Sequence, residues 1–202
     1  MIMSNCIRCE DFPCQDVRTE HYTVPAIDIE PGDAGIIMIS EAPPQDPADY
    51  FYSPGTPFYL QTTLAAFGDA GATVSSMADI LDLGVYITTA VKCAKTAYSI
   101  STRSVRSCSF LLQRELALFH NVKAFLLMGD VAIRAMNYIA KRETGARVIP
   151  SGSTYKIRDN EYFYRGTRAF PSYLQSGKSF LIEKSKRRMI AEDITAALDL
   201  AR

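Results

Sequence analysis

The sequence predicts a single α/β domain over residues 1–202, with a central, mostly parallel four-stranded sheet between two layers of helices. Short apolar, β-branched runs alternate along the chain with longer segments of helical periodicity. The 202 residues are enough to bury a core, and 48% are hydrophobic while 22% are charged, as is usual in globular domains. No repeat and no linker-like segment interrupts this alternation.

Four apolar runs are the expected strands. Residues 34–40 form the first and lead into a loop stiffened by three prolines, 41–47. Residues 85–93 form the second, a β-branched run that ends in a cysteine. Residues 122–128 and 167–173 complete the sheet.

Helical periodicity predicts helices over 58–70, 104–120, 130–142 and 180–200, and short alternating runs predict a hairpin within 147–165. Asp130 is the expected N-cap of the third helix. Side chains expected to face the core include Phe67, Phe110, Leu116, Ile182 and Ile190.

The first 33 residues look irregular and rich in cysteine, so we expect them to need an external staple such as a bound metal. Cys6 and Cys9 form a C-x-x-C pair ahead of every predicted strand, where a redox motif would be out of place. Cys93 and Cys108 could supply two further thiolates.

Spacing leaves the occupant of such a site open. Zinc usually takes its thiolates in two tight pairs, whereas a larger 4Fe-4S cluster tolerates a spread second pair such as Cys93 and Cys108. The two remain equal alternatives, with unligated buried thiols as a third. Cys14 is expected to be a free thiol or a substitute ligand.

Composition limits the cellular setting and the partners. The 22 basic and 22 acidic residues balance, so no global charge favours nucleic acid, although residues 184–188 form a basic cluster. The chain has no apolar run of membrane-spanning length and no secretion signal, so we expect a cytoplasmic protein without a membrane partner.

Two segments contain candidate site residues, one directly after a predicted strand and one at a predicted helix start. Glu41 lies on the proline-rich loop, where it could orient a water, although a solvated surface carboxylate is the commoner reading. Phe58 could stack on a planar base, or could simply belong to the core. No nucleotide-binding glycine motif and no serine-hydrolase elbow is present.

In chain order, these motifs resemble the uracil-DNA glycosylase superfamily, most closely its iron–sulfur branch, family 4. The resemblance rests on C-x-x-C at the start, Ser-Glu-Ala-Pro-Pro (40–44), Gly-Thr-Pro-Phe (55–58), Tyr-Ile-Thr-Thr-Ala-Val-Lys-Cys (86–93), Leu-Leu-Met-Gly (126–129) and Phe-Pro-Ser-Tyr (170–173). Each match is weak alone, but together they are specific and cover nearly the whole chain.

The resemblance implies a fold of that superfamily, a 4Fe-4S cluster, DNA as partner and hydrolysis of a glycosidic bond after base flipping. Glu41 would be the catalytic group. By the same resemblance, the cluster ligands would be Cys6, Cys9, Cys93 and Cys108, and the substrate-binding residues would be Ala42, Pro43, Phe58, Thr89, Phe170 and Ser172.

The departures from the family pattern lie in the pocket. Thr89 stands where the family has an asparagine that binds uracil, and Phe170 stands where a histidine supports charge on the departing base. Ser40 and Pro44 replace two glycines of the first loop. Losing one transition-state donor commonly lowers a rate by about 10²–10³-fold, so we expect weak or absent activity on uracil itself.

Three functions therefore remain. The first is a DNA glycosylase for another damaged or deaminated base, and the second is a non-catalytic iron–sulfur module that binds nucleic acid or recognises damage. The third is an iron–sulfur protein unrelated to DNA, since fold does not dictate function. For the first two we expect single- or double-stranded DNA as the partner, and for all three a monomer.

Overall fold

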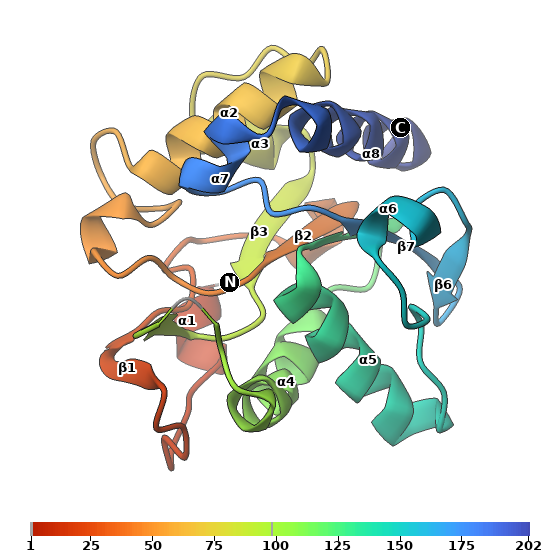
Figure 1. Ribbon diagram of the computed structural model, residues 1–202. Helices are drawn as coiled ribbons and strands as arrows, with labels where there is room; N and C mark the ends of the chain where they lie inside the picture. Colours follow the sequence, from red (N-terminus) through yellow and green to blue (C-terminus); the bar gives the residue numbers. More distant parts are fainter. Residues whose placement is uncertain (1, 98) are drawn as a thin grey trace.

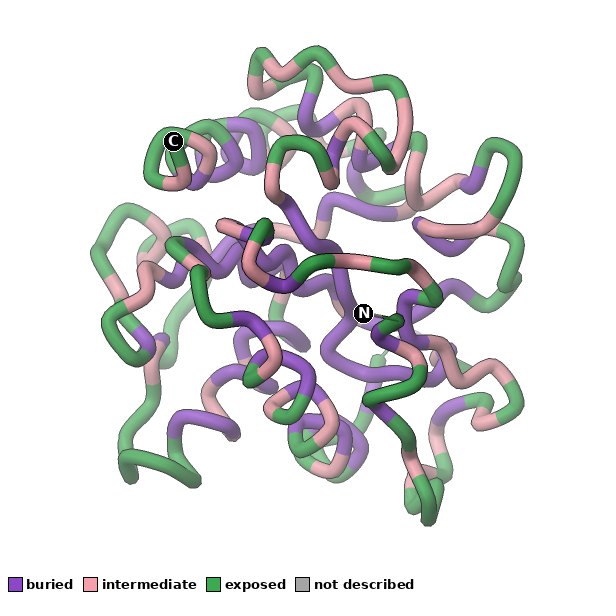
Figure 2. The backbone as a smooth tube through the Cα atoms, turned by 180° about the vertical axis from the view of Figure 1, so that it is seen from behind, coloured by how far each residue is buried: buried purple, intermediate pink, exposed green. Residues whose placement is uncertain are grey.

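The computed structural model describes residues 2–97 and 99–202. Its centre is a five-stranded sheet in the order β3-β2-β5-β7-β6, buried between helices on both faces (Figures 1 and 2). The strands are β2 (Ile36–Ser40), β3 (Val85–Thr89), β5 (Ala124–Met128), β6 (Tyr162–Tyr164) and β7 (Thr167–Ser172). Neighbours among β2, β3, β5 and β7 pair in parallel, which confirms the predicted α/β fold with a mostly parallel sheet.

The fifth strand, β6, is the difference from the predicted four. It pairs antiparallel with β7, with Tyr162 opposite Ala169. The connecting residues Arg165 and Gly166 both have positive φ, 52° and 80°, as a two-residue hairpin turn of the inverted type requires. The expected hairpin within 147–165 therefore uses β7 as its second strand.

Two helical layers cover the sheet (Figure 1). On one face, Ile36, Met38 and Leu126 pack with side chains from the layer of α2, α3 and α8; on the other, Ile37 and Leu127 pack with those of α4 and α5. The helices are α2 (Phe58–Asp69), α3 (Met77–Asp82), α4 (Thr102–Leu116), α5 (Asp130–Thr144), α6 (Thr154–Ile157), α7 (Lys178–Ile182) and α8 (Lys184–Ala201), with 3-10 turns η1 (Pro31–Asp33) and η2 (Pro47–Asp49).

Local chemistry explains the helix boundaries. A capping box of Ser76 and Asp79 starts α3, which the apolar pattern did not predict. The residue before α5 is Gly129, whose φ of 94° suits glycine, so Asp130 is the first helical residue and not the expected N-cap. The predicted helix over 180–200 is broken at Glu183 into α7 and α8.

Two predicted core positions are wrong. Phe110 on α4 is 52% exposed and Ile182 at the end of α7 is 76% exposed. Phe110 lies under the guanidinium of Arg142 instead, 4.0 Å from the ring centroid to Cζ. The break at Glu183 places Ile182 outside the buried stripe that continues through Ile190.

The amino-terminal segment is more ordered than predicted. It contains α1 (Met3–Cys6) and β1 (Val17–Tyr22), and β1 pairs antiparallel with β4 (Cys93–Lys95) in a second, two-stranded sheet. The predicted strand 85–93 therefore ends at Thr89. The chain turns at Ala90, whose N–H still donates to Ser40 O (2.8 Å), and Cys93 begins a strand of the other sheet.

Candidate functional site

The parallel strands β2 and β3 end side by side at Ser40 and Thr89, which face each other in register. Thr89 is fully buried, and its hydroxyl has no hydrogen-bond partner among the residues that the structure describes. A buried hydroxyl without a partner costs roughly 1–3 kcal/mol, which makes Thr89 a candidate to receive a ligand group. In a parallel sheet the carboxyl ends of the strands are where ligands bind.

Glu41 follows β2 at this edge and is held by both its backbone and its side chain. Its carbonyl accepts a hydrogen bond from Val91 N (3.0 Å). Its carboxylate lies 2.9 Å from Nζ of Lys95, and the two side chains are 17% and 23% exposed. Glu41 is therefore a positioned carboxylate rather than the freely solvated loop side chain that was the alternative.

The loop after Glu41 returns to the same edge. Ala42 and Pro43 are buried, so this part of the loop packs against the protein. Farther along, Asp49 accepts a hydrogen bond from the backbone N–H of Phe58 (3.2 Å) at the start of α2. Phe58 is half-buried there, neither a full core residue nor fully exposed.

Tyr59 extends the cluster on α2. Burial raises the pKa of its phenol to about 12, and the nearby carboxylates of Glu41 and Asp49 add to the shift because they disfavour a second negative charge. The phenol therefore remains a neutral hydrogen-bond donor beside two carboxylates at neutral pH.

The two predicted substrate residues on β7 lie deeper. Phe170 is 6% exposed and packs in the layer with α8, with the Arg168 guanidinium over its ring at 4.6 Å. Ser172 is fully buried at the strand end, beside Asp193 of α8. Both are buried side chains of β7. The Phe170 ring offers no polar group to a base.

Two buried polar residues at this edge were missed by sequence reasoning. Gln175 and Ser176, in the segment after β7, are 0% and 2% exposed. Ser176 Oγ lies 3.3 Å from Ser40 Oγ, and Gln175 Nε2 lies 3.3 Å from Met38 Sδ, while Gln175 Oε1 has no partner among the described residues. Their sequence, next to Gly177, reads only as a turn, so no local signal predicted their burial.

A second missed feature is a fully buried ion pair beneath Thr89. Lys92 donates to the carboxylate of Glu115 on α4, to Thr88 Oγ1 (2.8 Å) and to Thr89 O (2.6 Å). Glu115 also accepts from Tyr86 Oη (2.7 Å) and Thr88 Oγ1 (2.8 Å). All three ammonium protons therefore have acceptors, which is the condition under which a buried charge is tolerated.

Four of the five cysteines line one cavity of about 220 Å³ between the amino-terminal segment and α4. These are Cys9, Cys14, Cys93 and Cys108. Cys6 is exposed at the end of α1, does not line this cavity, and its thiol is directed to Ile2 O at 3.8 Å. The structure thus brings together three of the four predicted ligands and adds Cys14.

The thiols in this cavity interact with one another. Burial raises the pKa of Cys93 to about 12, and the nearby Cys108, Cys9 and Cys14 thiols contribute to that shift. Burial also raises the pKa of Cys108 to about 11, against the lowering effect of the Lys92 N–H that donates to its sulfur. A metal that bound here would have to displace these protons, and its charge would supply the driving force.

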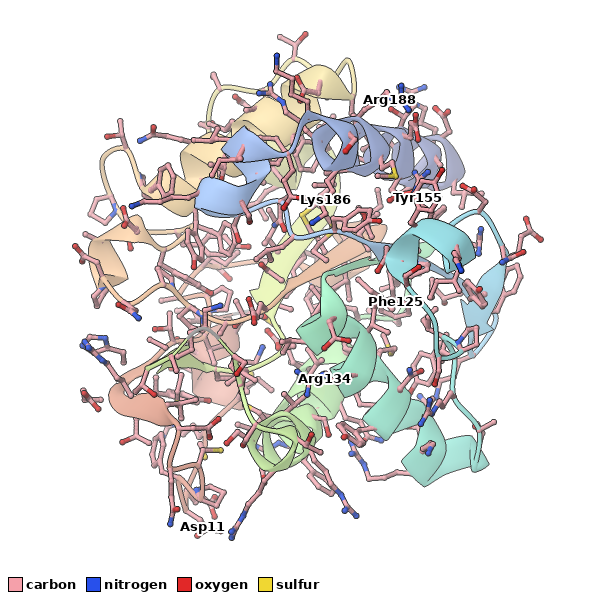
Figure 3. The ribbon with its side chains drawn as sticks, in the orientation of Figure 1. Asp11, Phe125, Arg134, Tyr155, Lys186 and Arg188 are labelled. Carbon is pink, nitrogen blue, oxygen red and sulfur yellow. The ribbon has the colours of Figure 1, made fainter. Side chains whose placement is uncertain are left out.

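The basic cluster at the start of α8 is largely neutralised. Arg187 pairs with Asp69, Arg188 with Glu192 at 3.5 Å, and Lys186 with Glu183 at 2.5 Å. Lys186 also lies 5.4 Å from the centroid of the Tyr173 ring, near the carboxyl edge of the sheet, whereas Arg188 points from the opposite side of α8 (Figure 3). Only part of this cluster therefore faces the candidate site.

Most of the chain matches the sequence model of one protein family. The sequence model described as the uracil DNA glycosylase superfamily matches residues 27–193, and a search of curated proteins found no match. The matched range includes Glu41, Phe58, Thr89 and Cys108, and it begins after Cys14. Among the described residues, no helix is both long and apolar enough to cross a membrane.

Proposed function

The chain belongs to the uracil-DNA glycosylase superfamily, and from this premise we propose that it hydrolyses the N-glycosidic bond of a damaged or deaminated base in DNA. In this reaction water adds to the sugar carbon, and the base leaves with the electrons of the broken bond. The protein must therefore hold a flipped base, position a water, and tolerate the negative charge that develops on the base.

The observation that carries this proposal is the placement of Glu41. Its carboxylate is held at the carboxyl edge of the sheet, 2.9 Å from Lys95 and near the neutral Tyr59 phenol. A half-buried carboxylate fixed by its neighbours can orient a water and accept its proton. The contact with Lys95 fixes the position of the carboxylate.

The surrounding residues suit a flat, polar ligand. Phe58 is half-buried at the start of α2, where its ring can stack on a base. Thr89 Oγ1 and Gln175 Oε1 are buried polar atoms without partners among the described residues, and both lie at the carboxyl edge of the sheet. We assign them the hydrogen bonds to the edge of the base.

The candidate site differs in two groups from what the resemblance implies for a uracil enzyme. Thr89 offers one hydroxyl where the family offers a carboxamide, and the packed ring of Phe170 replaces an imidazole. We therefore propose a substrate other than uracil, within the iron–sulfur branch that the motifs resemble.

Single-turnover excision tests the proposal. Protein purified without air is mixed in excess with oligonucleotides that carry uracil, other deaminated bases or oxidised and alkylated bases, each single- and double-stranded, and abasic product is counted. We expect product from one or a few of these bases and little from uracil. Absence of product from the whole panel, with DNA binding intact, would overturn the catalytic proposal.

The second candidate is a non-catalytic module that recognises damaged DNA. The burial of Phe170 in the core favours it, because no imidazole remains to support a leaving base. This candidate predicts salt-dependent binding to the same oligonucleotides without abasic product, since phosphate contacts release counterions. A protein that bound none of them at low salt would contradict both candidates.

A further inference from the structure

We propose that Cys9, Cys14, Cys93 and Cys108 together ligate a four-iron cluster, and that Cys6 stays outside the ligand set. The C-x-x-C pair would then not be the amino-terminal half of the site. The two amino-terminal ligands would be separated by four residues, within a segment that the matched family range does not include.

The four cysteines line a common cavity. Its lining comes from the loop after α1, from Val17 and Tyr22 of β1, from Cys93 at the start of β4, and from one face of α4 around Cys108. Thiols thus approach one space of about 220 Å³ from three separate parts of the chain. That volume is several times the roughly 30 Å³ that a water occupies in the liquid, and far more than one ion fills.

The loop that carries Cys9 and Cys14 turns at Phe12. Phe12, between them, has a φ of 41°, a conformation that is uncommon for a side chain of this size. Its ring packs edge-on against Tyr22, with centroids 5.5 Å apart, and this contact holds the turn. Asp11 marks the tip of the loop, below β1 in Figure 3.

Both ends of this loop are tied to α4 or to its start. Ahead of Cys9, the carbonyl of Arg8 accepts a hydrogen bond from Arg114 Nη2 (2.8 Å) of α4. After Cys14, the Asp16 carboxylate accepts from Ser101 N (2.7 Å) and from the hydroxyl of Ser104. The helix that carries Cys108 therefore also positions the two loop cysteines.

The environment of Cys108 also suits a cluster ligand. The backbone N–H of Lys92 donates to its sulfur at 3.2 Å. Hydrogen bonds from backbone amides to cysteine sulfur are among the interactions that tune iron–sulfur clusters, because they stabilise thiolate charge. The next residue, Cys93, is a ligand in the same proposal. Residues 92 and 93 would therefore supply both a ligand to the cluster and a hydrogen bond to the sulfur of another ligand.

Geometry favours a cluster over a single ion. Among residues 2–97 and 99–202, no group of three or more His, Cys, Asp or Glu side chains is arranged to hold one metal ion. Four thiols that surround a larger space without converging on one point suit a cluster, whose separate irons each take one cysteine. Zinc at this site would require the sulfurs to move together.

Cys6 lies outside this arrangement. It is exposed, and the buried side chains that anchor α1 are Met3 and Ile7 on either side of it. Replacing Cys6 should therefore leave all four proposed ligands in place, whereas replacing Cys14 should remove one of them.

Metal counting on variants tests the ligand set. Wild type, Cys6→Ser and Cys14→Ser are purified without air, and iron, sulfide and zinc are measured per chain together with the visible absorbance of the cluster. We expect Cys6→Ser to match wild type and Cys14→Ser to retain less than a third of the iron. Iron lost from Cys6→Ser and kept by Cys14→Ser would overturn the proposal.

Thiol labelling of the unmodified holoprotein guards against a Cys14→Ser variant that fails to fold. A maleimide added without air should label Cys6 and spare the other four cysteines, as peptide mapping by mass spectrometry would show. After iron removal all five should react. Labelling of Cys14 with protection of Cys6, or a wild-type protein that contains zinc or no metal, would contradict the assignment.

Discussion

At the scale of single residues, the candidate site keeps some of the groups that the family resemblance implies and lacks others. Glu41 keeps a held carboxylate, and Phe58 keeps a half-buried ring at the start of α2. Thr89 keeps only a hydroxyl, which is buried without a partner among the described residues. The discrimination between bases should therefore depend on Thr89 more than on Glu41.

Thr89→Asn should shift the base preference of the candidate site toward uracil. A carboxamide can both donate and accept a hydrogen bond at the edge of uracil, whereas Thr89 offers one hydroxyl. A site that makes both hydrogen bonds discriminates more strongly between bases than a site that makes one. We expect uracil excision to rise by about tenfold or more, up to the roughly 10²–10³-fold that one transition-state donor contributes. Single-turnover rates on uracil and on the preferred base would check this.

The control is Thr88→Asn. Thr88 neighbours Thr89 in sequence, but its hydroxyl faces the other side of the sheet and donates to Glu115. This variant should be less stable and should gain no uracil excision. Equal gains in both variants, or a loss of stability without any gain in Thr89→Asn, would refute the role of Thr89 in base choice.

At the scale of elements, the carboxyl end of β3 is fixed by the buried pair of Lys92 and Glu115. The pair joins α4 to the turn between β3 and β4, and through Lys92 N it reaches Cys108. Breaking such a pair leaves one buried charge uncompensated, which costs about 3–5 kcal/mol. The proposed cluster ligands and the proposed base site therefore share one structural support.

Lys92→Met should lower the free energy of unfolding by about 3–5 kcal/mol, because Glu115 would remain buried without a cation. Denaturant unfolding by circular dichroism would measure this change. Lys141→Met, an exposed substitution on α5, should stay within about 0.5 kcal/mol of wild type. Glu115→Leu combined with Lys92→Met should recover part of the lost stability. If Lys92→Met alone lost no more stability than Lys141→Met, the account of the ion pair would be contradicted.

The elements also show where sequence reasoning succeeds and where it stops. Strands such as β2 and β5 are fully buried, so their apolar runs predicted them within two residues. The apolar pattern did not predict the end of β3 at Thr89, because Ala90, Val91 and Cys93 are also apolar and buried although they lead into another sheet. Whether Cys6 or Cys14 faces Cys93 depends on the turn at Phe12, and no local pattern encodes that turn.

At the scale of the whole molecule, a small amino-terminal unit packs against the α/β core. The unit consists of α1, β1 and the loop with Cys9 and Cys14, and it contacts the core through β4 and α4 (Figure 1). The core has a buried apolar cluster on each face of the sheet, and the unit contributes Met3, Ile7 and Val17 to one of them. Because few buried apolar side chains anchor the unit, its order should depend on the proposed cluster more than order in the core does.

Removal of the proposed cluster should loosen residues 3–22 selectively. Site formation is coupled to folding, so protection against amide exchange should fall in β1 while β2 and β5 keep theirs. Hydrogen-exchange mass spectrometry before and after chelation would compare these segments. A loss spread evenly over the chain, or no change in β1, would contradict a local staple.

The most direct test of the central claim is the effect of Glu41→Gln on base excision. On the base that the wild type releases, the single-turnover rate should fall by about 10²–10⁴-fold, the range for a positioned general base, with DNA affinity changed by less than threefold. Glu161→Gln, an exposed carboxylate of the same size, should excise at the wild-type rate. Equal rates for Glu41→Gln and wild type would show that the chemistry does not pass through this site.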